Sequence, residues 1–225
     1  MTSSDDQHDE QSNDDADSSE TTPSEDGSET PVATYTILSI IAVILIGYGL
    51  TTWLTGAEQP DAYNGFEFTR TGQGFYETRV SGAAGETALQ FREHPSDVDN
   101  ISMSSRVPLA MRAMQERNGS LVLTVDDAYA EGGRSGIALY EISKITNYMF
   151  GINTTGAVMN ASLSDRYPEI TCANVTSERV VIEITEGEET AITEENGCIT
   201  MTAPTGADVI RGADRIVYGL LGIIE

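Results

Sequence analysis

The chain has 225 residues, of which 36 are acidic and 12 are basic, so its formal charge is −24. This length is enough for one domain with a real hydrophobic core. The charge excludes nucleic acid as a partner, because phosphate binding needs a basic patch and the chain has none.

The basic residues are almost all arginine. Lys144 is the single lysine, and the other 11 basic residues are arginines. A strongly acidic, lysine-poor composition resembles that of proteins from extremely halophilic archaea. At 1 M salt the Debye length is about 3 Å, so such a chain repels itself little. The alternative is an acidic mesophilic protein.

Residues 1–30 hold 11 acidic residues, no basic residue and almost no large apolar residue. Such a segment cannot bury enough apolar surface to offset its chain entropy, so we expect a disordered acidic tail. A docking tail for a cytoplasmic partner is the functional alternative to a simple solvated extension.

An uncharged stretch follows at residues 31–57, and its core from Val32 to Leu54 is apolar over 23 residues. About 20 apolar residues of helix cross a bilayer, so the stretch predicts a transmembrane helix with the lipid bilayer as its partner through residues 32–54. The strongly acidic segment before it is unlike the positive start of a cleaved signal peptide. We therefore expect an uncleaved signal anchor.

Five asparagines after this stretch match the N-glycosylation pattern N-x-S/T, where about two matches are expected by chance. They are Asn100, Asn118, Asn153, Asn160 and Asn174. The excess favours a glycosylated domain outside the cell. The alternative is that a chain rich in threonine forms such triplets freely.

Two cysteines, Cys172 and Cys198, follow the apolar stretch. In an oxidising environment they would form one disulfide, and their spacing is unlike that of redox or zinc motifs. Together with the glycosylation triplets they favour a single-pass protein of the cell membrane, with a cytoplasmic N-terminus and an extracellular C-terminal domain at residues 58–225.

This domain is expected to be α+β or α/β, with a β-hairpin part at residues 58–95 and an α/β part at residues 96–225. The first part alternates apolar and polar residues over three short strands, at residues 66–68, 75–80 and 87–91. In the second part, the patterns predict helices at 108–116, 138–149 and from 205 onward, and strands at 121–125, 156–161, 179–185 and 198–202.

The runs ITCANVTSERVVIEITEGEETAITEENGCITMTA and GADRIVYGLLGII are similar to C-terminal segments of small archaeal membrane-anchored proteins with no assigned function. FEFTRTGQGFYETRV and HPSDVDNI fit the same pattern. The resemblance covers most of residues 60–225. It implies no reaction, and no functional residue is carried over from it.

The best candidate for chemistry is a group of carboxylates after the strand predicted at 121–125. Asp126, Asp127 and Glu131 would lie at its carboxyl end, where α/β proteins place their sites, and could hold Ca²⁺ or Mg²⁺. The alternative is that adjacent acids are the background of this chain. No cofactor motif is present, and His94, the only histidine after the tail, is expected to be a turn residue beside proline.

Two functions remain open at this point. The first is a non-catalytic binding or scaffold protein of a halophilic cell envelope, with other membrane or envelope proteins as partners. The second is an anchored hydrolase that uses carboxylates or a bound divalent cation.

Overall fold

The computed structural model describes residues 31–54, 61–82, 85–130, 133–160, 162 and 166–225. By its contacts the chain divides into two compact units, residues 1–57 and residues 58–225. The tail predicted as disordered, residues 1–30, lies outside the described residues.

The first unit contains one helix, α1 (Pro31–Leu54). The prediction of a transmembrane anchor is wrong by the following finding: in the described part of the chain, no helix is long and apolar enough to cross a membrane. The described side chains of α1 are those of residues 37–48. At 1.5 Å per residue they rise about 18 Å, whereas the hydrocarbon core of a bilayer measures about 30 Å. The single-pass localisation that rested on this anchor, and the orientation derived from it, are corrected with it.

The second unit opens with a four-stranded antiparallel sheet in the order β1-β2-β3-β4. Its strands are β1 (Asp61–Tyr63), β2 (Phe66–Arg70), β3 (Tyr76–Gly82) and β4 (Gly85–Phe91). Asn64 and Gly65 join the first two strands, and both have positive φ angles, 48° and 84°. Positive φ at both central residues is typical of the tight turn that asparagine–glycine pairs form between strands.

A mixed six-stranded sheet follows, in the order β5-β9-β10-β8-β6-β7. All neighbouring pairs are parallel except β9 and β10, which are antiparallel. Its strands are β5 (Ser102–Met103), β6 (Ser120–Val125), β7 (Asn153–Val158), β8 (Arg179–Glu186), β9 (Ala191–Glu195) and β10 (Cys198–Ala203). The sheet has one fully apolar face, because alternate residues of its central strands point to the same side.

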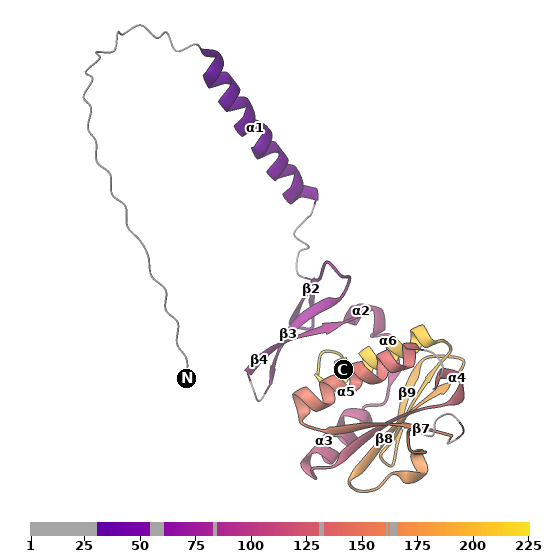
Figure 1. The fold of residues 1–225 in the computed structure, drawn as a ribbon. Helices are drawn as coiled ribbons and strands as arrows, with labels where there is room; N and C mark the ends of the chain where they lie inside the picture. The colour runs from indigo at the N-terminus through magenta and orange to yellow at the C-terminus, as the bar shows by residue number, and fades with distance from the viewer. Residues whose placement is uncertain (1–30, 55–60, 83–84, 131–132, 161, 163–165) are drawn as a thin grey trace, which may run out of the picture. The chain divides into compact units, whose positions relative to one another are not determined.

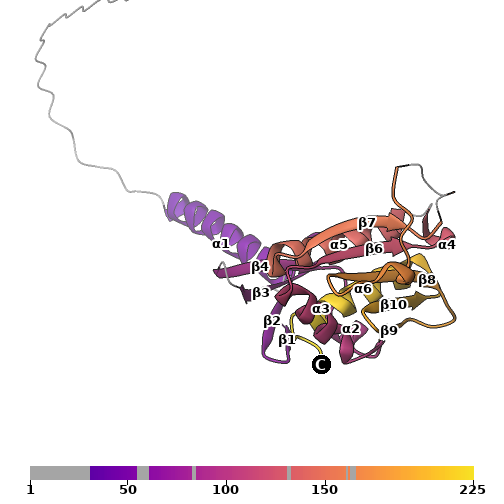
Figure 2. The ribbon, with the colours of Figure 1, turned by 90° about the horizontal axis from the view of Figure 1, so that it is seen from below.

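Three helices cover this apolar face: α3 (Arg106–Glu116), α5 (Gly133–Phe150) and α6 (Gly206–Leu220). Figures 1 and 2 show α5 and α6 side by side across the sheet. The short helices α2 (Pro95–Val98), α4 (Asp127–Ala130) and η2 (Cys172–Asn174) lie in connections. On the opposite face, Val122, Ala157 and Val181 form a small separate cluster with Ile170 and Val175 of the β7–β8 connection.

Helix α6 lies at the centre of the domain. Thr205 caps its start by accepting a hydrogen bond from the Asp208 backbone N–H, as the sequence predicts. Val209 and Ala213 pack in the core with the large sheet, while Tyr218 packs on Phe91 of the small sheet with ring centroids 4.4 Å apart. One continuous core therefore joins both sheets through α6.

The fold class is therefore corrected to a mixed α/β domain with two sheets, without a membrane-spanning helix among the described residues. The strands at 66–70, 76–82, 85–91, 120–125, 153–158, 179–186 and 198–203 and helices α3, α5 and α6 lie where the sequence patterns indicate them. Sequence analysis missed the short strands β1, β5 and β9, because each has too few buried apolar residues to form a visible alternation.

Glycine at position 212 lets α6 approach the large sheet closely. A Cβ atom built on Gly212 would overlap the side chain of Met201 on β10, whereas one built on Gly136 of α5 would meet no atom within 4 Å. Gly212→Ala should therefore lower the free energy of unfolding by about 1–3 kcal/mol, the usual cost of overpacking a core. Gly136→Ala is the matched control, and should raise it by about 0.5–1 kcal/mol because glycine is a poor helix former.

The measurement is urea-induced unfolding of both variants at constant high salt. Equal effects of the two substitutions would show that α6 does not contact β10 as closely as described.

Candidate functional site

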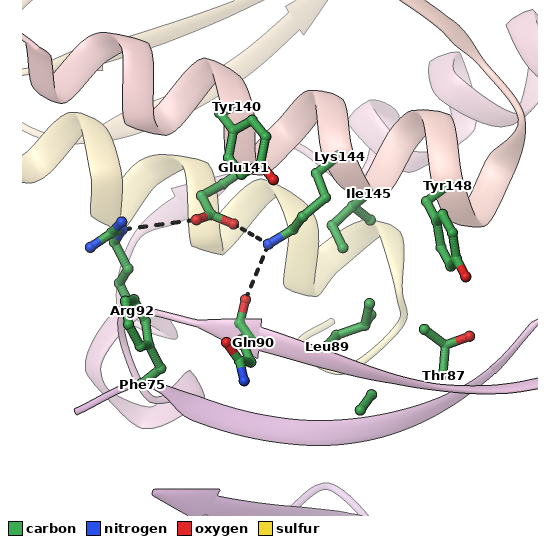
Figure 3. Close-up of a pocket in the computed structure, with 11 residues that line it drawn as sticks. Phe75, Thr87, Leu89, Gln90, Arg92, Tyr140, Glu141, Lys144, Ile145 and Tyr148 are labelled. Atoms are coloured by element: carbon green, nitrogen blue, oxygen red, sulfur yellow. Dashed lines mark hydrogen bonds and ion pairs between the residues drawn. The ribbon is translucent and has the colours of Figure 1, made fainter. Parts of the chain in front are cut away.

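A cleft lies between strand β4 of the small sheet and helix α5, with a volume of about 520 Å³. This is within the usual range of ligand pockets, about 300–1,000 Å³. Its floor is apolar, because the side chains of Leu89 on β4 and Ile145 on α5 are buried there. Figure 3 shows these residues facing each other across the gap.

One face of α5 forms the wall of the cleft. Tyr140, Lys144 and Tyr148 are spaced four residues apart, so they lie along the same side of the helix. Both tyrosines are largely exposed, at 61% and 70%. Large exposed aromatic side chains beside a hollow are typical of binding surfaces.

Three charged side chains meet at one end of the cleft. Lys144 Nζ lies 2.5 Å from Glu141 Oε2 and donates a hydrogen bond to the backbone carbonyl of Gln90 on β4, at 3.4 Å. Arg92 Nε lies 3.9 Å from Glu141 Oε1, and the Arg92 guanidinium stands over the ring of Phe75 at 5.0 Å from its centroid. Figure 3 shows Glu141 between the two cations.

The balance of charge here differs from that of the whole chain. The residues that line the cleft carry two positive charges, on Arg92 and Lys144, and one negative charge on Glu141, which leaves a net charge of +1. The chain as a whole has −24. By contrast, a hollow of about 670 Å³ over the small sheet is lined by the carboxylates of Glu67, Glu77 and Glu86. The cleft is therefore suited to an anionic or neutral ligand.

Behind the cleft, Asp214 of α6 is buried and fixes the end of β4. Its Oδ2 atom accepts hydrogen bonds from the backbone N–H groups of Arg92, at 3.1 Å, and Glu93, at 2.9 Å. Burial raises the pKa of Asp214 to about 7; the nearby carboxylates of Glu141 and Glu93 also raise it, while the two backbone hydrogen bonds lower it. Tyr218 adds a hydrogen bond of 2.6 Å from its hydroxyl to the Glu93 carbonyl.

The carboxylates predicted as a metal site have other roles in the structure. Asp126 lies at the carboxyl end of β6, as expected, but its two oxygens accept hydrogen bonds from the backbone N–H groups of Ala128, at 3.0 Å, and Glu186, at 2.9 Å. It therefore caps helix α4. Asp127 is exposed in the first turn of that helix, and Glu131 lies outside the described residues.

Cys172 and Cys198 form a disulfide, with their Cα atoms 5.3 Å apart. The bond ties the β7–β8 connection to β10, and Glu183 of β8 accepts a hydrogen bond from the Cys172 backbone N–H. Within the described part of the chain, these three residues are the one group with metal-ligand atoms close together. Because the two sulfurs are bonded to each other, they are not available as thiolate ligands.

The five asparagines of the glycosylation triplets are all exposed. They are spread over the surface: Asn100 follows α2, Asn118 follows α3, Asn153 begins β7, Asn160 follows β7, and Asn174 ends η2. Their modification stays a prediction.

His94 is a buried capping residue, 6% exposed. Its Nδ1 atom lies 2.8 Å from the hydroxyl of Ser96 and accepts the Ser96 backbone N–H, which caps α2. Its Nε2 atom lies 3.7 Å from Asp61, beyond hydrogen-bond distance, and the ring packs against Phe68 and Tyr76. Serine, histidine and aspartate are thus close in space, but the histidine is embedded in aromatic packing, so we assign the group a structural role.

Sequence analysis missed the cleft. The signals were present, because Lys144 is the single lysine and Tyr140, Lys144 and Tyr148 share helical spacing. They pointed nowhere without the knowledge that β4 packs opposite α5. Comparisons with protein-family models, with curated proteins and with solved structures give no match for the chain.

The raised pKa of Asp214 predicts a specific pH dependence of stability. Its folded-state pKa of about 7 lies above the ordinary value of 3.8, so the protonated form favours folding. This contribution is fully present below about pH 4 and is lost as the pH rises through about 7, a change of about 4 kcal/mol. Asp214→Asn keeps an oxygen for the two backbone N–H groups and cannot ionise. It should match the wild type in stability at pH 4.5 and exceed it at pH 8, as measured by urea unfolding in constant high salt.

Asp214→Ala is the contrasting variant, because it removes the acceptor of both hydrogen bonds and should be destabilised at both pH values. If Asp214→Asn changed stability by the same amount at pH 4.5 and pH 8, the carboxyl group would not titrate in the way described.

Proposed function

We propose that residues 58–225 form a non-catalytic binding module and that the cleft between β4 and α5 receives its partner. The observation that carries the proposal is the cleft itself, where two exposed tyrosines flank a lysine above an apolar floor. Such a combination of aromatic anchors, an apolar base and a few polar groups is typical of recognition sites.

The composition supports a second part of the proposal, that the module works in molar salt. Exposed charge pairs are weak there because screening is nearly complete beyond about 3 Å. Recognition under these conditions depends on apolar contacts, main-chain hydrogen bonds and partly buried charges. The cleft offers all three, since Leu89 and Ile145 are buried and Glu141 is only 8% exposed.

The alternative function, hydrolysis by carboxylates or by a bound divalent cation, has less support. Its best candidate, Asp126, has both oxygens engaged by backbone N–H groups. Asp127 is exposed on a separate turn, and no hollow with a volume given above includes either residue.

A photo-crosslinking amino acid placed in the cleft tests the proposal in native cells. Replacing Tyr148 or Tyr140 with benzoylphenylalanine should yield the same discrete adduct, because both residues line one cleft. Leu109 on α3 is the matched control: it is 60% exposed, and it does not line the cleft. The readout is the mass and identity of adducts by gel and mass spectrometry.

Adducts that are absent at positions 140 and 148, or that appear equally at position 109, would overturn the binding proposal. Loss of a hydrolytic activity in the double variant Asp126→Asn, Asp127→Asn with unchanged crosslinking would favour the alternative instead.

A further inference from the structure

We infer that the cleft binds an extended polypeptide segment that carries an acidic side chain, and that this segment adds to the small sheet as a strand beside β4. The inference rests on the proposed function, since it names the chemistry of the partner in the same cleft. Three features of the described residues lead to it: the free edge of β4, the unsatisfied cation at its end, and the aromatic wall of α5.

Strand β4 is an edge strand, because the sheet order is β1-β2-β3-β4. The Gln90 carbonyl accepts its hydrogen bond from Lys144 on α5, so this peptide group points away from β3 and toward the cleft. Peptide groups of an antiparallel strand alternate in direction, so those of Ala88 and Glu86 point the same way as Gln90. This row of main-chain donors and acceptors is what an added strand requires.

The charged end of the cleft lacks an acceptor. Arg92 Nε is buried and has no hydrogen-bond partner, because Glu141 Oε1 is 3.9 Å away. Glu141 is instead held at hydrogen-bond distance by Lys144. A carboxylate from the partner would accept from Arg92 Nε and pair with Lys144, so that two carboxylates balance two cations. Charge complementarity therefore favours an acidic segment.

The side chains of the cleft match the alternation of a strand. A bound strand places every second side chain on the same face, about 6.6 Å apart. One such side chain would lie at Arg92 and Lys144, and the next would lie over Leu89 and Ile145 near Tyr148. We therefore expect an acidic residue with apolar residues two positions away on each side.

The test uses two fluorescein-labelled peptides and the full-length chain. The first is Thr-Val-Thr-Glu-Thr-Val-Thr, blocked at its C-terminus, and the control replaces glutamate with glutamine. Binding is measured by fluorescence anisotropy at two high salt concentrations. The glutamate peptide should bind at least about tenfold more tightly than the control, because a hydrogen bond to a charged group contributes more than a neutral one.

Two variants separate the charge from the edge. Lys144→Met should bring the two peptides to within about twofold of each other. Ala88→Pro removes the N–H group that faces the cleft without removing a ladder bond to β3, because proline is tolerated on the outer side of an edge strand. It should weaken both peptides at least about tenfold, with a thermal unfolding curve to confirm that the variant is folded.

Equal binding of both peptides to the wild type, or unchanged binding to Ala88→Pro, would overturn the inference. Competition by free glutarate at the concentration of the peptide would also overturn it, because the site would then recognise a small carboxylate. If neither peptide bound while the crosslink from Tyr148 persisted, the acidic-strand inference would be wrong and the binding function would stand.

Discussion

The burial of helix α6 between two sheets is the constraint on which the rest of the domain depends. The helix is buried on almost every side, including at its polar residues Asp214 and Arg215. Burial of charged groups is costly unless each has partners, so these residues fix whatever they contact. Arg215 binds the carbonyl oxygens of Ile101, at 3.2 Å, and Glu225, at 3.0 Å. The loop after α2 and the end of the chain are thereby held against α6.

The same helix sets the geometry of the cleft. Asp214 and Tyr218 hold residues 92 and 93, which directly follow β4, and α5 packs beside α6 on the large sheet. The distance between β4 and α5 is therefore determined by a third element that lies behind both. This arrangement keeps the outer edge of β4 open instead of letting it close onto α5, with the bridge from Lys144 to Gln90 as the one described hydrogen bond across the gap.

Much of the domain follows from sequence patterns alone. Strands with several buried apolar residues, such as the run from Leu121 to Val125, have a pattern that decides their structure. Strand β9 was not predicted because it contains one fully buried residue, Ile192, among threonine and glutamate. The turn at Asn196 and Gly197, with φ angles of 54° and 86°, was the signal that would have indicated a hairpin there. The disulfide was predicted because only one cysteine pair exists.

The site was beyond sequence reasoning for a physical reason. Arg92 and Glu141 lie far apart in the chain, and their meeting depends on the packing of two sheets around α6. The adjacent aspartates at 126 and 127 looked like a site, but the first serves as a helix cap. Residues 31–57 were interpreted from hydropathy alone, which counts apolar residues without knowing which of them belong to one described surface.

The outer edge of β4 offers the most direct measurement of the central claim, that the cleft is a site for an added strand. Amide hydrogen exchange can be followed residue by residue, with and without the glutamate peptide at saturation. The account predicts that the amides of Ala88 and Gln90 exchange more slowly in the complex, while the exposed Asn153 at the start of β7 is unaffected. Unchanged exchange at Ala88 and Gln90 in a demonstrated complex would contradict it.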